Sequence, residues 1–327
     1  MPSPERTTLP TLMTRVTAVI PCFNGEKYLA TAIASVRAQT RPVDEILVID
    51  DRSTDRSRDV AHEAGARVVT LDVNGGPSRA RNAGLDHASG AVVAFLDADD
   101  VWTGQHCEIV VGLLERAPNA VLGFGRSAYH QFPTVISPAS LPAGVPCDAL
   151  EAVMRANPVT QSAAVVRREV VIEAGGYDAT MRHSEDFDLW LRLALIGPFV
   201  CTHEITCWRD AHEAQASRNL LAMRRGAWQA RARALTALDA RDDVTRRRKA
   251  WEAAVAGWRH ELREAWLGES PDGLESALAI RREYGLPSGP YWSGMVRRHV
   301  LWGPRQVARH VWRRARGRSV SPLLTGR

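Results

Sequence analysis

Lysine is scarce in this chain. Its 327 residues include only Lys27 and Lys249, and they contain no Gly-x-x-x-x-Gly-Lys-Ser/Thr sequence. A P-loop needs that glycine-rich loop and its lysine to hold phosphates, so the P-loop class of nucleotide-hydrolysing enzymes is excluded. A phosphohydrolase with an aspartate nucleophile would also want a nearby lysine, and none is available.

Cysteines and long apolar runs are scarce as well. The five cysteines are scattered, which favours a reducing compartment over a disulfide framework. Cys201, His203 and Cys207 could form half of a zinc site, but no second cluster completes it, so we expect buried thiols and a loop histidine. No apolar stretch approaches the roughly 18 residues of a membrane span, and no signal peptide is expected. We therefore expect a cytoplasmic protein.

Acidic residues are absent beyond Glu283, whereas nine arginines lie between Arg297 and Arg327. Without them, 33 basic residues face 37 acidic ones, so the net charge of +5 becomes −4 for residues 1–283. A helix from Pro304 onward would place apolar residues and arginines on separate arcs. That pattern is typical of an amphipathic helix bound to an anionic membrane surface, although docking on the acidic catalytic region is the alternative. Nucleic acid is not expected as a partner, because no recognised binding module accompanies the arginines.

Short β-branched runs alternate with helical patterns over residues 16–124, which indicates an α/β fold with a mostly parallel sheet flanked by helices. The predicted strands are Val16–Ile20, Glu45–Asp50, Arg67–Leu71, Ala91–Leu96 and Ala120–Phe124. The predicted helices are Lys27–Ala38, Asp55–Ala64, Ser78–Ala88 and Gln105–Arg116.

The second half of the chain reads differently. A proline-rich loop at 131–147 leads to a helix at Asp148–Arg155, a strand at Ala163–Val166 and a buried helix at Ser184–Leu195. Residues from about 216 to 284 are rich in Ala, Arg and Glu, which predicts a helical C-terminal region. The expected divisions are an N-terminal extension (1–15), a catalytic domain (16–217, with halves 16–130 and 131–217), a helical region (218–288) and a basic tail (289–327).

Polar clusters follow three of the predicted strands. They are Pro21-Cys-Phe-Asn24, Asp50-Asp51-Arg-Ser53 and Asp97-Ala-Asp99-Asp100. Ligands of open parallel sheets bind outside the carboxyl ends of the strands, so we expect these clusters to form one site.

Three carboxylates within four positions, at Asp97, Asp99 and Asp100, would repel one another unless a positive charge lay among them. A Mn²⁺ or Mg²⁺ ion bridging the protein to a phosphorylated ligand answers this, because such ions commonly take only one or two carboxylates from the protein. An acidic surface turn is the alternative.

Two further segments suit a nucleotide. The Asp51 carboxylate can accept hydrogen bonds from a base or ribose, although Ser53 or Thr54 could instead cap the next helix. The segment Gly75–Gly84 resembles a flexible loop that opens a helix bearing two arginines, which suits a diphosphate; a solvated basic helix face is the alternative.

Together these motifs resemble those of family 2 glycosyltransferases with the GT-A fold. The matching segments, in the family's order, are Ala18–Asn24, Val48–Asp55, Arg79–Gly84, Phe95–Trp102 and Ser184–Arg192. The resemblance covers roughly residues 16–217. It implies a nucleotide-diphospho-sugar donor such as a UDP-, GDP- or dTDP-sugar, a divalent metal, and inversion at the anomeric carbon.

The resemblance also implies roles for particular residues. Asp97 would face the ribose, Asp99 would hold the metal and Asp51 would contact the base. The remaining nucleotide-side candidates are Pro21, Phe23, Asn24, Glu26, Ser53, Arg81 and Ala98. Asp100 has no assigned role. Arg52 stands where the family often has glycine, so its turn must avoid a positive φ or tolerate strain.

Glu185-Asp186 matches the family's acidic pair, whose second member is usually the catalytic base. Displacement at the anomeric carbon needs a carboxylate that takes the acceptor's proton, and partial burial near Phe187 and Trp190 would raise the proton affinity of Asp186. The alternative is that both acids merely favour a helix N-terminus.

The segment Trp208–Ser217 resembles the family's closing Arg-x-x-His element. In it His212 could complete the metal shell or meet a phosphate, and Arg209 could support the acceptor. A solvated loop histidine is the alternative.

The sequence thus predicts an inverting glycosyltransferase that moves a sugar to a saccharide or lipid-linked acceptor in cell-envelope or extracellular polysaccharide synthesis. A non-catalytic membrane-surface adaptor and an NAD-dependent enzyme are the alternatives. The second rests on Gly123–Ala128, which a proline-rich loop follows instead of a helix.

Overall fold

The computed structural model describes residues 14–131, 135, 141–210, 220–267 and 279–284. The chain divides into two compact units, Met1–Ala254 and Val255–Arg327. The predicted basic tail and His212 lie outside the described residues. Among the described residues, no helix is long and apolar enough to cross a membrane.

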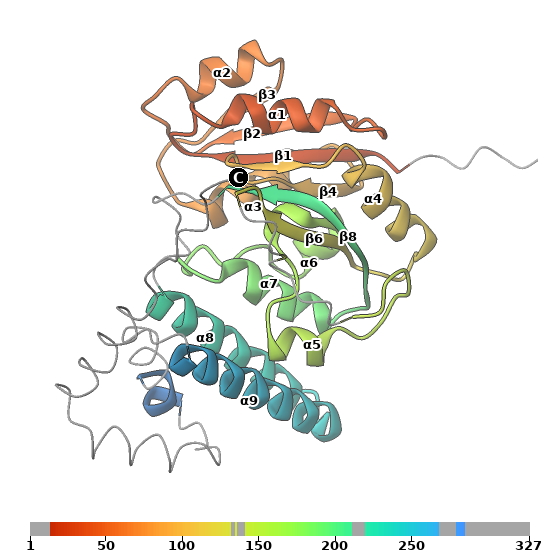
Figure 1. The fold of residues 1–327 in the computed structure, drawn as a ribbon, viewed down its shortest axis with the longest axis vertical. Coiled ribbons are helices and arrows are strands. Elements are labelled where there is room, and N and C mark those ends of the chain that lie inside the picture. Colours follow the sequence, from red (N-terminus) through yellow and green to blue (C-terminus); the bar gives the residue numbers. More distant parts are fainter. Residues whose placement is uncertain (1–13, 132–134, 136–140, 211–219, 268–278, 285–327) are drawn as a thin grey trace, which may run out of the picture. The chain divides into compact units, whose positions relative to one another are not determined.

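An eight-stranded sheet forms the centre of the first unit, in the order β3-β2-β1-β4-β7-β6-β8-β5 (Figure 1). Strands β3, β2, β1 and β4 are parallel neighbours, whereas β7 runs antiparallel to both β4 and β6. The strands are β1 (Val16–Cys22), β2 (Glu45–Asp50), β3 (Arg67–Thr70), β4 (Val92–Phe95), β5 (Asp100–Trp102), β6 (Leu122–Tyr129), β7 (Ala164–Arg167) and β8 (Phe199–Arg209). The prediction of a mostly parallel α/β sheet is therefore confirmed.

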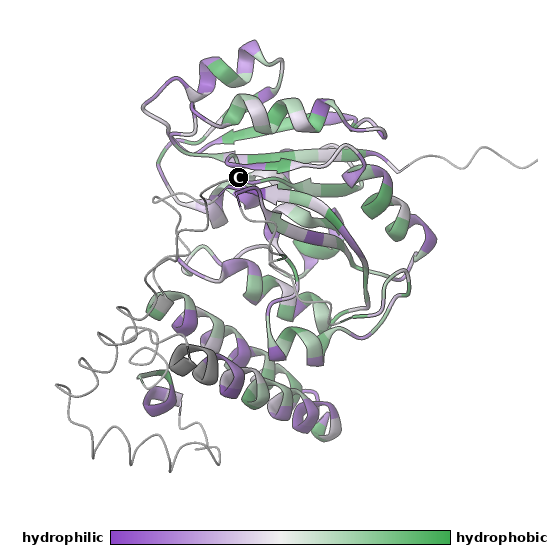
Figure 2. Cartoon of the chain, viewed as in Figure 1, coloured by the Kyte–Doolittle hydropathy of each residue, from purple (hydrophilic) through white to green (hydrophobic). Residues whose placement is uncertain are grey.

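Helices cover the sheet because successive side chains of a strand point to opposite faces. Ala18 and Ile20 of β1 belong to a buried cluster with α1 (Leu29–Arg37) and α4 (His106–Arg116). Between them, Val19 meets α3 (Pro77–His87), where a Cβ on Gly84 would lie 2.3 Å from a Val19 methyl group. Successive residues of β1, such as Ala18, Val19 and Ile20, are therefore all buried, and the central strands are mostly hydrophobic (Figure 2).

Helix α2 (Ser57–Glu63) lies beside α1. The helices that follow in the chain are α5 (Leu150–Arg155), α6 (Arg168–Glu173), α7 (Glu185–Ala194), α8 (Leu220–Asp239) and α9 (Val244–Leu267), which continues across the division. Helix α7 packs against both α5 and α8. Trp190 of α7 and Trp228 of α8 are buried, so apolar burial of aromatic rings holds this layer together.

The predicted elements agree with the structure apart from β5, α6 and β8, which were not predicted, and apart from the length of β6. Asp100–Trp102 forms β5, which pairs with β8. Strand β6 begins at Leu122 and extends to Tyr129, five residues beyond the predicted end. Cys201, His203 and Cys207 lie on strand β8, so the prediction of a loop histidine was wrong, whereas the two thiols are buried as expected. The polarity of Thr202, His203 and Glu204 hid this strand from a reading based on apolar runs.

Candidate functional site

Two loops at the carboxyl edge of the sheet are joined to each other by hydrogen bonds. Asn24, which follows β1, donates its backbone N–H to Ser53 Oγ (2.9 Å) and accepts from the Thr54 N–H through Oδ1 (2.8 Å). Gly25 N–H donates to Ser57 Oγ at 2.8 Å, and Glu26 Oε2 accepts from the Arg56 N–H at 2.9 Å. The loops after β1 and β2 therefore form one preorganised surface, which leaves the Phe23 ring exposed.

This arrangement replaces the predicted helix cap. Helix α2 begins at Ser57, and its N-cap residue is Arg56, whose side chain makes no cap bond. The Ser57 N–H donates to Asp55 Oδ1 at 3.0 Å, so the alternative roles of Ser53 and Thr54 as N-caps were wrong. Ser53 instead serves the neighbouring loop, a long-range contact that no local pattern reveals.

Asp51 holds the start of α3. Its two carboxylate oxygens accept the backbone N–H groups of Gly75 (2.8 Å) and Gly76 (2.7 Å), and Gly76 adopts a φ of 82°. A carboxylate has about four acceptor sites, so these bonds still leave capacity for a ligand. Asp51 thus joins two of the segments expected to meet a nucleotide.

The backbone at Arg52 has a φ of 68°. Of the two expectations for Arg52, the structure shows the second: the residue adopts a positive φ and tolerates the strain. An L-residue in this left-handed conformation costs about 1–2 kcal/mol. The surrounding hydrogen bonds, such as Ser53 N–H to Asp50 Oδ1 at 3.0 Å, hold the turn in place.

The acidic turn after β4 is built from three carboxylates in different surroundings. Asp97 and Asp99 are half-buried, whereas Asp100 is buried and accepts from Ser162 Oγ at 2.5 Å. Arg209 lies 3.5 Å from Asp100, to which it is also the strand partner. Burial raises the pKa of Asp100 to about 8; Arg209 lowers it, and the carboxylates of Asp97 and Asp99 raise it further.

Arg81 connects this turn to the acidic helix. From α3 its buried guanidinium donates to Asp97 Oδ1 and to Glu185 Oε1, both at 2.8 Å, and lies 5.5 Å from the centre of the Tyr177 ring. Burial alone would lower the pKa of Arg81, but the two carboxylates hold it above its ordinary value. The bond to Glu185 joins residues 104 positions apart.

Asp186 follows at the start of α7. Its Oδ1 accepts from the Phe187 N–H at 2.7 Å, and Asn157 Nδ2 lies 3.4 Å from its Oδ2. Desolvation and the adjacent Glu185 raise the pKa of Asp186 to about 6, although Arg81 acts in the opposite direction. A carboxylate with this pKa is ionised at neutral pH yet more basic than an ordinary aspartate, as a proton acceptor should be.

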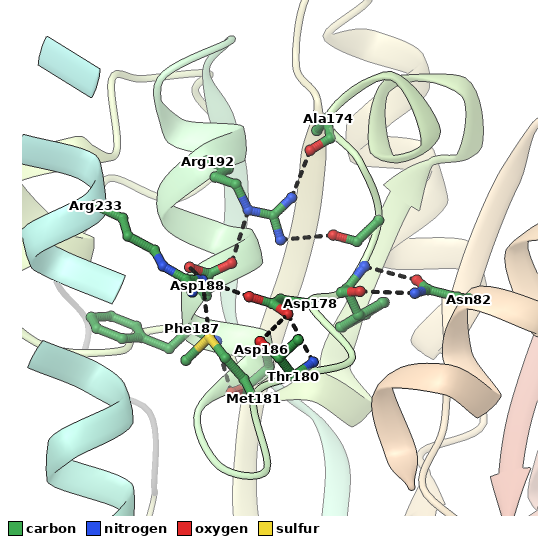
Figure 3. A network of polar contacts seen from close by, with 12 residues as sticks. Asn82, Ala174, Asp178, Thr180, Met181, Asp186, Phe187, Asp188, Arg192 and Arg233 are labelled. Carbon is green, nitrogen blue, oxygen red and sulfur yellow. Dashed lines mark hydrogen bonds and ion pairs between the residues drawn. The ribbon is translucent and has the colours of Figure 1, made fainter. Parts of the chain in front are cut away.

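Arg192 and Arg233 form ion pairs with Asp188 of the acidic helix α7 (Figure 3). Asp188 is buried and contacts Arg192 at 2.9 Å and Arg233 of α8 at 3.4 Å. Arg192 also donates to the carbonyl oxygens of Ala174 and Gly176, and Arg233 contacts Asp178 at 2.7 Å. The orientation of α7, and hence of Asp186, is set by charges that the sequence reading did not single out.

The other predicted residues are distributed around this centre. Ala98 lies against Gly25, where an added Cβ would be 3.5 Å from that of Ala98. Trp190 is fully buried, which suits a supporting place in the core. No motif in the sequence pointed to Ser162. Its hydroxyl donates a hydrogen bond to Asp100 and accepts one from the Asp97 N–H at 3.0 Å.

Comparisons with known proteins support the fold and identify a family. An open α/β sheet with acids at its strand ends and an acidic helix facing them defines the GT-A class of fold. Residues 17–177 match the family described as glycosyl transferase family 2. Over these residues the chain belongs to this family.

One relative is the Escherichia coli UDP-Glc:alpha-D-GlcNAc-diphosphoundecaprenol beta-1,3-glucosyltransferase WfgD. It is 34% identical over 102 residues, which are 30% of this chain and 40% of that protein. The chain spans only about a third of the length of the curated relatives that it matches first.

Two solved structures share the fold. Staphylococcus aureus TarS 1–349, in complex with UDP-GlcNAc, has a TM-score of 0.64 at 16% identity, covering 80% of this chain and 79% of that one. The mannosyltransferase PcManGT of Pyrobaculum calidifontis, in complex with GDP-Man and Mn²⁺, has a TM-score of 0.52 at 18% identity, covering 92% and 86%.

Proposed function

We propose that this protein is an inverting glycosyltransferase that moves a sugar from a nucleotide-diphospho-sugar to an acceptor hydroxyl, with Asp186 as the general base. The observation that carries the proposal is the contact of Arg81 with both Asp97 and Glu185 at 2.8 Å. It links the acidic turn, on the nucleotide side, to the residue next to Asp186. Donor and proton acceptor would then lie on opposite sides of one reacting centre, as inversion requires.

The nucleotide would lie over the joined loops after β1 and β2. The exposed ring of Phe23 offers a surface for stacking a base, and Asp51 keeps acceptor capacity for its donors. Pro21, Asn24, Glu26 and Ser53 would shape this surface through the contacts between the two loops. Asp97 would face the ribose.

The donor set of the acidic turn suits a hard divalent cation. Asp97, Asp99 and Asp100 bring three carboxyl groups together, and Asp100 Oδ1 is buried without a hydrogen-bond partner among the described residues. Burial, followed by the carboxylates of Asp97 and Asp99, raises the pKa of Asp100, while Arg209 lowers it. This excess of negative charge is what Mn²⁺ or Mg²⁺ would offset. No three His, Cys, Asp or Glu side chains in the described residues gather into a metal site, which suits an ion completed by phosphate and water.

Asp99 would hold the metal, with His212 as a candidate further ligand from outside the described residues. When bound, the ion would stabilise the negative charge of the departing diphosphate. Asp186 would accept the proton of the attacking hydroxyl. Arg81 would keep Asp97 and Glu185 at fixed positions, so that acceptor and donor meet in the right orientation.

The acceptor is proposed to be a saccharide or a lipid-linked saccharide of a cell-envelope or extracellular polysaccharide. The printed name of WfgD, a relative over its matched part, describes a diphosphoundecaprenol-linked acceptor. A cytoplasmic location, peripheral on the inner face of the membrane through the basic tail, would bring the enzyme to such a lipid.

The test is a panel of UDP, GDP and dTDP, titrated into the full chain with and without Mn²⁺, followed by the matching intact sugar nucleotides. We expect one nucleoside diphosphate to bind more tightly with metal, and Asp99→Asn to abolish that gain. Asp59→Asn, which removes an exposed carboxylate from α2, is the control and should keep it. Preference for NAD, or indifference to metal in the wild type, would overturn the proposal.

A further inference from the structure

A second concave surface lies beside the start of the acidic helix. It is a hollow of about 380 Å³ between the Thr180–His183 segment and the first turns of α8. Arg182 and His183 line it from one side, and Arg225, Gly226 and Gln229 line it from the other.

The lining is basic. Arg182, His183 and Arg225 line the hollow, and among the described residues of its lining there is no Asp or Glu. The side chains of Arg182, Arg225 and Gln229 are exposed to solvent. Guanidinium groups present several N–H donors in a planar arrangement that matches phosphoryl oxygens, and Gln229 adds neutral hydrogen-bonding capacity.

The two sides of the hollow contact each other at the start of α7. Ser184, whose φ is 60°, donates its hydroxyl to the Met223 carbonyl oxygen of α8 at 2.9 Å. A Cβ on Gly226 would lie 2.4 Å from the His183 carbonyl oxygen, so the glycine permits this close approach. His183 precedes Asp186 by three positions, so their Cα atoms can be at most about 11 Å apart.

We propose that this hollow binds a phosphoryl group of a phosphorylated acceptor whose hydroxyl is presented to Asp186. The inference rests on the proposed function and names the class of its acceptor. The phosphoryl group can belong to a free sugar phosphate or to a lipid-linked sugar diphosphate. In both cases recognition through Arg182 and Arg225 would select phosphorylated acceptors over neutral ones.

The first experiment measures the binding of pyrophosphate and of glucose 1-phosphate to the full chain by calorimetry, without divalent metal. The variant Arg182→Ala/Arg225→Ala should weaken binding at least about tenfold, since each charged hydrogen bond contributes roughly 1.5–3 kcal/mol. Arg116→Ala/Arg248→Ala removes two exposed arginines elsewhere and should bind as the wild type does. Glucose itself should not bind measurably.

Equal binding by the wild type and by Arg182→Ala/Arg225→Ala would overturn the proposal. Arg182→Lys/Arg225→Lys should recover part of the binding and keep the melting temperature of the wild type. Such a result would show that the alanine variant loses binding because it loses charge, and not because it is unfolded. This titration is made without divalent metal, so its result does not depend on the metal that Asp99 is proposed to hold. A failed nucleotide panel would therefore refute the proposed function while this result stood.

A second experiment separates the two sources of the phosphoryl group. Binding to neutral vesicles that contain a glycosyl diphosphoprenol, but not to glucose 1-phosphate, would assign a lipid-linked acceptor. Binding of the soluble sugar phosphate alone would assign a free one. If Arg182→Ala/Arg225→Ala loses whichever binding the wild type shows, the hollow is the binding site. If wild type and variant bind only phosphatidylglycerol vesicles, and bind them equally, the proposal is contradicted.

Discussion

The loops after β1 and β2 and the acidic centre around Arg81 are both polar, yet they are stabilised in different ways. In the loops, short hydrogen bonds link Asn24, Ser53 and Asp51 to backbone groups of neighbouring segments. In the acidic centre, one buried guanidinium serves two carboxylates, and both Asp100 and Asp186 have raised pKa values. The loops are held by hydrogen bonds between neighbouring segments. In the acidic centre, burial of the carboxylates costs free energy that these contacts do not fully offset.

This difference indicates a division of labour. Satisfied hydrogen bonds hold a binding surface in one conformation without altering the proton affinity of its groups. Desolvated carboxylates cost stability, but they supply a base that ordinary aspartates do not. Changes in the acidic centre should therefore affect chemistry, and changes in the loops should affect folding and nucleotide affinity.

Asp186→Asn is expected to have the largest effect. Removal of a general base typically lowers the rate by about 10²–10⁴-fold, while nucleotide and metal binding should stay near normal. Because the folded-state pKa of Asp186 is raised, its charge destabilises the fold above the unfolded pKa. The variant should therefore gain about 1–2 kcal/mol in free energy of unfolding at pH 7 and nothing below pH 4, measured in urea.

Asp188→Asn provides the matched comparison on the same helix. It weakens contacts with Arg192 and Arg233, so it should lower stability where Asp186→Asn raises it. Full transfer by Asp186→Asn would remove this residue from the mechanism.

Arg81→Met should be nearly as severe, through folding. It leaves Asp97 and Glu185 without their shared partner, and breaking a buried ion pair in this way costs about 3–5 kcal/mol. Arg56→Met, which removes an exposed arginine 3.6 Å from the exposed Asp59 on the loop side, should cost less than about 1 kcal/mol. Equal losses in urea-induced unfolding would contradict the distinction between the two regions.

Asp51→Ala tests the loop region. The change removes two hydrogen bonds to the Gly75 and Gly76 N–H groups, so we expect a loss of about 2–3 kcal/mol in free energy of unfolding and weaker nucleotide binding. The pH dependence of transfer should not change, because Asp51 lies outside the acidic centre. A shifted pH profile would show that the two regions are coupled.

The pH profile of the wild type is the next test. Transfer needs ionised Asp186, so its rate should fall about tenfold per pH unit below a midpoint near pH 6. Asn157 stabilises the ionised form through its 3.4 Å contact, and Asn157→Ala should move this midpoint upward by a few tenths of a unit. A midpoint near pH 4 in kcat would mean that Asp186 is not the base, or is not desolvated.

The same contrast explains what the sequence could reveal. The alternation of apolar runs predicted β1, β2 and β4, and the parallel-sheet rule placed their polar ends at one edge. The bonds between Arg81 and Glu185, and between Ser162 and Asp100, could not be predicted, because they join residues 104 and 62 positions apart. Strand β8 was missed for a related reason, since its pairing with β6 overrides the polarity of Thr202–Glu204.

Arg52→Gly should have the smallest effect, and it is the one change expected to stabilise the loop region. Glycine adopts a φ of 68° without the steric cost of a Cβ, but it also increases the entropy of the unfolded chain. The net gain should be about 0.5–1 kcal/mol, measurable in urea. Asp242→Gly, at a φ of 55° in the turn between α8 and α9, is a control for the same backbone effect. A gain at position 242 but a loss at position 52 would mean that the Arg52 side chain makes a favourable interaction that outweighs its strain.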